Sequence, residues 1–205
     1  MKIEHASFAS MPSRHRATLI NSLAGIKQAV LVGTRSPEGR SNLAIFNSLI
    51  HIGANPPMYG LLFRPDTVRR DTLSNILSKG EYTLNYVRSA DYKKAHQTSA
   101  KYDESTSEFA ACGFEEERSH ESDAPFVKDA VVKISMKFES KTDIPLNGTI
   151  LIIGSIQEII IDDSLVGDDG FVSLFKADPL LCSGLDAYYR AEFIGREPYA
   201  QPTKK

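Results

Sequence analysis

Polar and apolar residues alternate along several stretches of the chain, and a period of two is typical of β-strands with one buried face. From Val132 to Phe138 every second residue is apolar, and the stretch from Thr149 to Ile161 is almost entirely apolar. Gly154 interrupts the second stretch, which predicts a bulge or sharp bend there. Further strands are predicted at 26–34, 42–52, 58–63 and 81–87. Many strands with few helices predict a mainly β protein whose sheet forms a closed or nearly closed barrel.

The period changes to that of a helix between Asp71 and Lys79, where Leu73, Ile76 and Leu77 share one face. Either Asp71 or Thr72 can cap the start of this helix, and Gly80 follows where a left-handed residue ends many helices. A second helix is predicted between Pro12 and Gly25, after a polar arm formed by residues 1–14.

Basic and hydroxyl residues gather just before the helix that begins near Asp71. Arg64, Arg69 and Arg70 lie there together with Thr67, and Thr72 follows. Guanidinium groups, hydroxyls and a helix N-terminus together suit a phosphate monoester. A capped surface helix beside a solvated basic loop explains the same residues equally well.

A polar residue interrupts an apolar row in the predicted strand at 42–52. Asn47 shares a face with Leu43, Ile45, Leu49 and His51. A buried amide without partners costs about 1–3 kcal/mol, so Asn47 needs hydrogen bonds if it is buried. Either a flat heterocycle with carbonyls and ring nitrogens or a neighbouring backbone segment would supply them.

Three motifs in this part of the chain resemble the flavin reductase-like family. They are LAIFNSL, then NPPMYGLLF, then RRDTLSNILSKGEYTLNYV, and weaker similarity continues to about Tyr189. The resemblance implies a mainly β fold, an antiparallel six-stranded Greek-key split β-barrel with peripheral helices. It also implies one FMN-binding domain over residues 1–205, with an N-terminal arm at 1–14 and a C-terminal tail at 190–205.

The resemblance also implies roles for particular residues. Arg64 and Arg70 would contact the FMN phosphate, Thr72 would complete that pocket, and Asp71 would cap the helix or bind ribityl hydroxyls. Since three arginines lie where one would be enough, the one that contacts phosphate stays open. The isoalloxazine ring would be lined, largely through backbone groups, by Ala44, Ile45, Phe46, Asn47 and Ser48.

By the same resemblance, the protein is expected to be an FMN-dependent oxidoreductase that moves hydride from NADH or NADPH to flavin or another acceptor. Because the flavin carries the chemistry, no catalytic residue is assigned. The alternative is a non-enzymatic FMN-binding carrier or sensor of the same fold. A homodimer is expected, a monooxygenase is a candidate partner, and the physiological acceptor stays open.

Composition and charge exclude several other classes. The 205 residues include 24 Lys and Arg against 26 Asp and Glu, a formal net charge of −2 that gives no reason to expect nucleic acid or an anionic membrane. Cys112 and Cys182 are isolated, which fits a reducing compartment. No run approaches the roughly 18 apolar residues of a membrane span, and the first residues lack a signal-peptide core, so we expect a cytoplasmic protein.

Three other regions are less informative. The histidines have no metal-ligand spacing, and the acidic stretch at 161–170 departs from the calcium-loop pattern, so no metal is predicted. His96, Gln97, Thr98 and Ser99 lie in a polar excursion that the residues alone favour as solvated surface, whereas the resemblance implies a place near the cofactor or the dimer partner. Tyr188 and Tyr189 pack either over the barrel mouth or on its outside.

Overall fold

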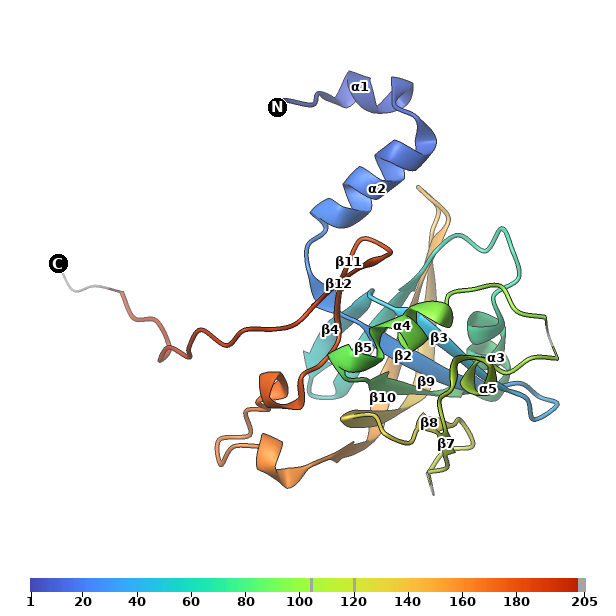
Figure 1. Ribbon diagram of the computed structural model, residues 1–205, viewed down its shortest axis with the longest axis vertical. Coiled ribbons are helices and arrows are strands. Elements are labelled where there is room, and N and C mark those ends of the chain that lie inside the picture. The colour runs from blue at the N-terminus through green and yellow to red at the C-terminus, as the bar shows by residue number, and fades with distance from the viewer. Residues whose placement is uncertain (104, 120, 203–205) are drawn as a thin grey trace.

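The computed structural model describes residues 1–103, 105–119 and 121–202, and its centre is a large antiparallel sheet with helices at the periphery (Figure 1). The mainly β fold predicted from the alternating pattern is therefore confirmed. The seven strands of this sheet, in the order β3-β2-β6-β9-β10-β5-β4, are β2 (Val30–Arg35), β3 (Ser41–Phe46), β4 (Leu49–Ala54), β5 (Pro57–Phe63), β6 (Glu81–Tyr86), β9 (Val132–Ile144) and β10 (Thr149–Ile161).

The two edges of this sheet are joined by a very short connection. Strands β3 and β4 form opposite edges, yet only Asn47 and Ser48 separate them along the chain. Three Cα–Cα steps of about 3.8 Å span at most roughly 11 Å, so both edges must approach each other there. The sheet is therefore curled into a barrel that is split at this crossing.

The predicted strand at 42–52 is thus divided, which is why the sheet has seven strands and the predicted count of six is not confirmed. Side chains hold the chain at the crossing. Asn47 Nδ2 donates to the carbonyl oxygen of Gly184 at 2.7 Å, and Ser48 Oγ donates to that of Leu62 at 2.7 Å. These contacts replace the ladder hydrogen bonds that a continuous strand would make.

Large side chains fill the barrel, and the longest strands bend around them. Tyr82, Leu84, Met136 and Ile152 are fully buried in its main core. The register of β9 against β10 shifts between Ile153 and Gly154. The predicted bulge at Gly154 is therefore confirmed, and it lets the long hairpin follow the curvature of the barrel.

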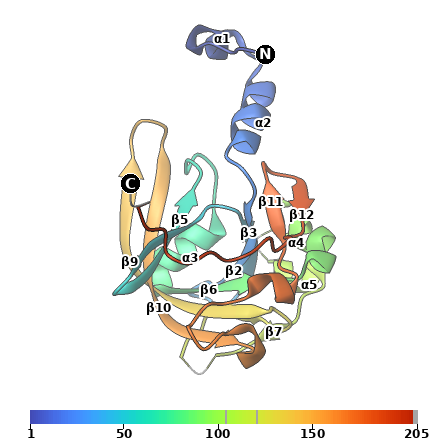
Figure 2. The same cartoon turned by 90° about the vertical axis from the view of Figure 1, so that its left-hand side faces the viewer.

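Helix α3 (Asp71–Lys79) has the predicted bounds, and Gly80 ends it in the left-handed region with φ of 76°. The N-terminal helices α1 (His5–Ser10) and α2 (Ser13–Leu23) contain no buried residue and project away from the barrel (Figure 2). The remaining helical elements are η1 (Ser89–Asp91), α4 (Tyr92–Gln97), α5 (Glu108–Cys112), η2 (Asp163–Leu165) and η3 (Leu174–Ala177).

A small second sheet places residues 181–189 beside α4. Its strands are β1 (Lys27–Gln28), β11 (Leu181–Ser183) and β12 (Ala187–Tyr189), in the order β1-β11-β12. The strand predicted at 26–34 is therefore divided at Ala29, between β1 and β2. Strands β7 (Glu116–Glu117) and β8 (Phe126–Val127) form a separate pair.

Both cysteines of the chain are free and buried. Within residues 1–103, 105–119 and 121–202, no helix has the length and apolar character needed to cross a membrane.

Candidate functional site

A cavity of about 880 Å³ lies where the β3–β4 crossing, the start of α3, the segment after α4 and the β11–β12 turn meet. This volume is within the range of roughly 300–1,000 Å³ that small-molecule sites occupy. The structure brings all nine residues of the predicted FMN site to its wall: Ala44, Ile45, Phe46, Asn47, Ser48, Arg64, Arg70, Asp71 and Thr72.

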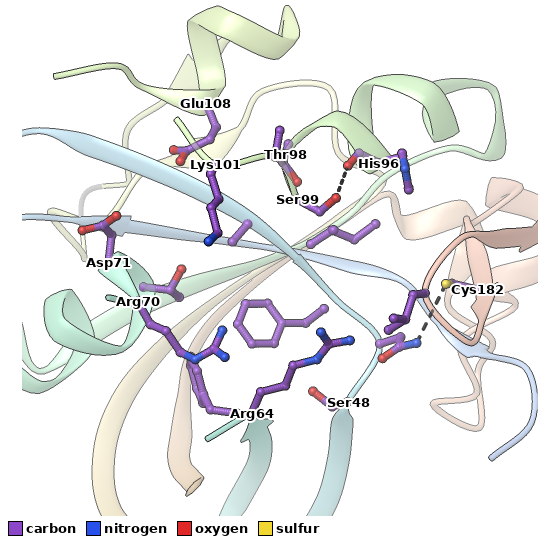
Figure 3. A pocket seen from close by; sticks show the side chains of 18 of the residues that line it. Ser48, Arg64, Arg70, Asp71, His96, Thr98, Ser99, Lys101, Glu108 and Cys182 are labelled. Carbon is purple, nitrogen blue, oxygen red and sulfur yellow. Dashed lines mark hydrogen bonds between the residues drawn. The ribbon is translucent and has the colours of Figure 1, made fainter. Parts of the chain in front are cut away.

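One end of the cavity is basic and lies at the start of α3, where Figure 3 shows Arg70 and Asp71 together. Arg70 is the N-cap residue, with φ of −131° and ψ of 94°, and no side chain caps the helix. The predicted capping role of Asp71 or Thr72 is therefore wrong. Both residues lie inside the first turn of the helix, and Arg69 Nε pairs with the Asp71 carboxylate at 2.7 Å.

The three arginines differ in their surroundings. Two N–H groups of Arg70 donate to the Pro65 carbonyl oxygen, at 3.0 and 3.2 Å, which fixes a half-buried guanidinium. Arg69 is exposed and pairs with Asp71. Arg64 is exposed and makes no hydrogen bond or ion pair with the described residues; it extends between Arg70 and Ser48 in Figure 3.

Thr72 is held by a buried polar network. Asn42 Nδ2 donates to Thr72 Oγ1 at 3.0 Å and to Thr34 Oγ1 at 3.1 Å, and Asn75 Nδ2 donates to the same Thr34 oxygen at 3.0 Å. Thr72 Oγ1 therefore accepts a hydrogen bond, while its own proton has no acceptor in the described part of the chain. This proton is available to a ligand at the helix start.

Two charged residues of this end were not predicted. Lys101 extends toward Arg70 and Asp71 from the segment after α4, and Glu108 lies beside it (Figure 3). Glu108 Oε2 accepts from the backbone N–H of Leu43 at 3.1 Å, and burial raises the pKa of its carboxyl. Nothing in the local sequence signals either residue, since both reach the cavity only through tertiary folding.

The middle of the cavity is apolar. Ala44, Ile45 and Leu62 line it together with Phe46 and Phe63, whose rings meet edge to face with centroids 4.9 Å apart. A planar aromatic ligand would be favoured against this wall because it buries apolar surface there.

The end farthest from Arg70 contains His96 and Cys182 (Figure 3) and is completed by residues of the β11–β12 turn. Asn47 donates to the backbone of this turn, so the second of the two partners considered for its amide is the one observed. His96 Nδ1 lies 2.8 Å from Tyr188 Oη, and burial raises the pKa of Tyr188 to about 12.

His96, Thr98 and Ser99 all line the cavity that contains the predicted FMN residues, so the place that the resemblance implies describes them better than solvated surface alone. His96 and Ser99 are exposed, whereas Thr98 is buried. Of the two tyrosines, Tyr188 lines the cavity mouth and Tyr189 does not. Periodicity cannot distinguish a polar face toward solvent from one toward a cavity.

No group of three or more His, Cys, Asp or Glu side chains among the described residues is placed to hold a metal ion. In the acidic stretch at 161–170, Asp162 Oδ1 accepts from the backbone N–H of Ser164 and Asp169 pairs with Arg196, so these carboxylates have protein partners.

Comparison with known proteins gives a consistent result. A family model described as "Flavin reductase like domain" matches residues 24–182. A solved structure from Shewanella frigidimarina NCIMB 400, assigned as a flavin reductase with a split barrel domain, is 42% identical, has a TM-score of 0.93 and is matched over 98% of this chain and 100% of that chain.

Two more distant solved structures show the same fold. Nitrilotriacetate monooxygenase component B from Bacillus cereus is 17% identical, with a TM-score of 0.85 over 96% of this chain and 98% of that chain. An FMN-binding protein from Thermus thermophilus is 16% identical, with a TM-score of 0.71 over 86% of this chain and 93% of that chain. At these identities the likeness concerns the fold alone.

Proposed function

Because the chain belongs to the flavin reductase like domain family, we propose that it is an FMN-dependent oxidoreductase that transfers hydride from NADH or NADPH to flavin or to another acceptor. One observation supports this most strongly: the nine residues expected around FMN come from separate segments and line a single cavity. The cavity is basic at one end and apolar in the middle, as a phosphate joined to a flat ring requires.

The phosphate would lie at the start of α3. Helix α3 directs its unpaired N–H groups there, and its dipole favours an anion. Arg70, Thr72 and Lys101 would donate hydrogen bonds to the phosphate oxygens. Arg70 is the preferred arginine because its contact with Pro65 already orients it, so less side-chain entropy is lost on binding.

The isoalloxazine ring would lie along Ala44–Ser48, where the edge strand β3 pairs with β2 alone and Asn47 and Ser48 lie outside the strands. Phe46 supplies an apolar face, and Asn47 holds the crossing to the β11–β12 turn. The residues present therefore fit FMN. A single phosphate pocket favours FMN over FAD, and mass spectrometry of the ligand released on denaturation would distinguish the two.

Bound FMN would accept a hydride and pass the electrons to an acceptor, so the chain itself need supply no general base. Its residues would anchor the phosphate, orient the ring and exclude water from one of its faces. The sequence assigned no catalytic residue, which is consistent with FMN supplying the redox chemistry and the protein supplying binding and orientation.

We also propose the finer features implied by the family. The sheet would be its six-stranded Greek-key barrel, with β3 and β4 as two halves of one strand, and the domain would include residues 1–205. A homodimer would bury apolar side chains left exposed on α2, such as Ile20 and Leu23, which are 49% and 73% exposed. A monooxygenase stays a candidate partner, and the cytoplasmic location stays a prediction.

Anaerobic mixing of the FMN-loaded protein with NADH or NADPH tests the proposal. Loss of the flavin absorbance within seconds is expected. A protein that binds FMN but keeps its absorbance with both nucleotides would instead be a carrier or sensor.

A further inference from the structure

The segment that follows β12 is fastened along the outside of the protein. It comprises residues 190–196, and we call it the C-terminal strap. The Phe193 ring stacks on that of Phe175, with centroids 4.7 Å apart and 13° between the ring planes. Arg196 Nη2 pairs with the Asp169 carboxylate at 2.7 Å. Every residue of the strap is exposed, and exposed contacts are individually weak, so the strap can detach without unfolding the barrel.

The first residue of the strap completes a small polar cluster. Arg190 Nε donates to Ser89 Oγ at 2.7 Å and lies 3.5 Å from the Asp178 carboxylate. Ser89 Oγ donates to that carboxylate at 2.5 Å, and the Ser89 N–H donates to the Asp178 carbonyl oxygen at 2.8 Å. The cluster therefore joins three segments: the start of η1, which leads into α4, the end of η3, which leads into β11, and the exit from β12.

The elements that this cluster joins form one wall of the cavity. His96 of α4 lines it together with Cys182, Leu185 and Tyr188 from β11, β12 and their turn, whereas no residue of the strap does. Strand β12 is three residues long, lies at the edge of its sheet and pairs with β11. Beyond that pairing it is held by the 2.8 Å contact of Tyr188 with His96 and, through the chain that follows it, by the strap. A short edge strand held in this way can move away from α4 when the strap detaches.

We propose that the C-terminal strap is a latch on the cavity. While it is fastened, β12 closes this wall; when it detaches, β12 moves away from α4, and a ligand enters or leaves. The inference rests on the proposed function only for the ligand, FMN, since the opening is a property of the chain itself. A latch changes the rates of binding and dissociation together and leaves their ratio nearly unchanged, because the same opening serves both directions. Contacts that stabilise the bound ligand would change mainly the dissociation rate.

The two free cysteines allow the opening to be measured without any ligand. Cys182 lies opposite Tyr188 in the β11–β12 register and is 4% exposed, so movement of β12 uncovers its thiol. Cys112 on α5 is 7% exposed and does not line the cavity, so it reports a general loosening of the protein. The rate at which iodoacetamide alkylates each thiol is measured by peptide mass spectrometry on the ligand-free protein.

Three substitutions each remove one fastening of the strap: Arg190→Ala, Phe193→Ala and Arg196→Ala. Each is expected to speed the alkylation of Cys182 roughly twofold to fivefold, as for the loss of one weak contact. The triple variant should speed it more, and the Cys112 rate should stay unchanged throughout.

The kinetics of FMN binding give the second readout. In stopped-flow fluorescence, the association and dissociation rate constants of the triple variant are expected to rise by about the same factor, with the Kd nearly unchanged. Tyr199→Ala is the matched control for both measurements and should behave as the wild type. It changes an aromatic residue beyond the strap, where the chain extends away from the barrel (Figure 1) and this side chain is 90% exposed.

Two alkylation results would overturn the latch: a Cys182 rate no higher in the triple variant than in the wild type, or an equal increase at Cys182 and Cys112. A rise in the FMN dissociation rate alone would also contradict it, because the strap would then only stabilise the bound ligand. If the wild-type protein binds no FMN, the proposed function fails, and the alkylation rates still test the opening. The two failures are therefore distinguishable.

Discussion

The guanidinium group of Arg70 donates two hydrogen bonds to the carbonyl oxygen of Pro65, through Nη2 at 3.0 Å and Nε at 3.2 Å. Arg70 is also the N-cap residue of α3. The contact thus fixes a cation beside the unpaired N–H groups of a helix start, where a phosphate is favoured by both.

Replacement of this arginine tests the phosphate assignment. Hydrogen bonds to charged groups are worth about 1.5–3 kcal/mol, so Arg70→Ala is expected to weaken FMN binding roughly tenfold to a hundredfold. Riboflavin, which lacks the phosphate, should bind the wild type and the variant nearly alike in fluorescence titrations. Equal losses for both ligands would indicate damage to the 64–70 loop, and no loss for either would move the role to Arg64 or Arg69.

Thr72→Val keeps the shape of the side chain and removes its hydroxyl. The Thr72 hydroxyl has a free proton, so its loss is expected to weaken FMN binding, by less than the arginine change and again without affecting riboflavin. The variant also removes the acceptor of the Asn42 hydrogen bond. Unchanged thermal stability is therefore the control that assigns the effect to the ligand.

Lys101 is expected to contribute to the same end of the cavity. Lys101→Ala should weaken FMN binding by about tenfold, within the range for a charged hydrogen bond. Lys94→Ala is the matched control, because Lys94 is exposed, pairs with Asp91 at 3.6 Å and does not line the cavity. A similar loss for both lysines would indicate a general effect of charge, contrary to a contact with the phosphate.

Much of the fold could be predicted because its signals are local. The alternation of polar and apolar residues predicted the strands, and Gly154 predicted the bulge in β10. A periodic apolar face and Gly80 predicted the bounds of α3. The break at Asn47 and Ser48 could not be predicted, since both residues fit an alternating strand. Their partners, Gly184 and Leu62, come from other segments and are brought there only by the closure of the barrel.

The site was predicted where a contiguous motif carries it and missed where the chain returns to it from far away. The residues before and inside α3 are neighbours in sequence, so their convergence could be inferred. His96 reaches the cavity from the short helix α4, Lys101 from the segment after it and Tyr188 from the three-residue strand β12, and these elements are too short to show a period. The cap was predicted wrongly because Arg70 occupies the N-cap position, so Asp71 and Thr72 lie inside the first turn of the helix.

The barrel bulge predicts a stability effect. A Cβ added at Gly154 would lie against the Tyr82 hydroxyl and 2.8 Å from the Lys137 carbonyl oxygen, so Gly154→Ala is expected to lower the free energy of unfolding by about 1–3 kcal/mol. The Tyr82 hydroxyl is buried and has no hydrogen-bond partner in the described chain. Tyr82→Phe should therefore be nearly neutral alone and should partly rescue Gly154→Ala in urea unfolding. Additive losses in the double variant would contradict this coupling.

Glu108 predicts a pH effect on stability. Burial raises the pKa of its carboxyl above the ordinary value of 4.5, so between 4.5 and the folded-state pKa the folded protein holds a proton that the unfolded chain releases. Stability therefore falls as pH rises through that window, and the favourable contribution is fully present only below it. Glu108→Gln should remove this fall, as measured by urea unfolding in steps from about pH 4 to pH 8. Glu192→Gln, an exposed matched change, should retain it.

A crystal structure of the protein grown with FMN tests the assignment of this cavity most directly. The expected result is phosphate density at the first turn of α3, within hydrogen-bond distance of Arg70 and Thr72, with the isoalloxazine ring along Ala44–Ser48. Phosphate density away from α3, or FMN bound outside the cavity, would contradict the assignment.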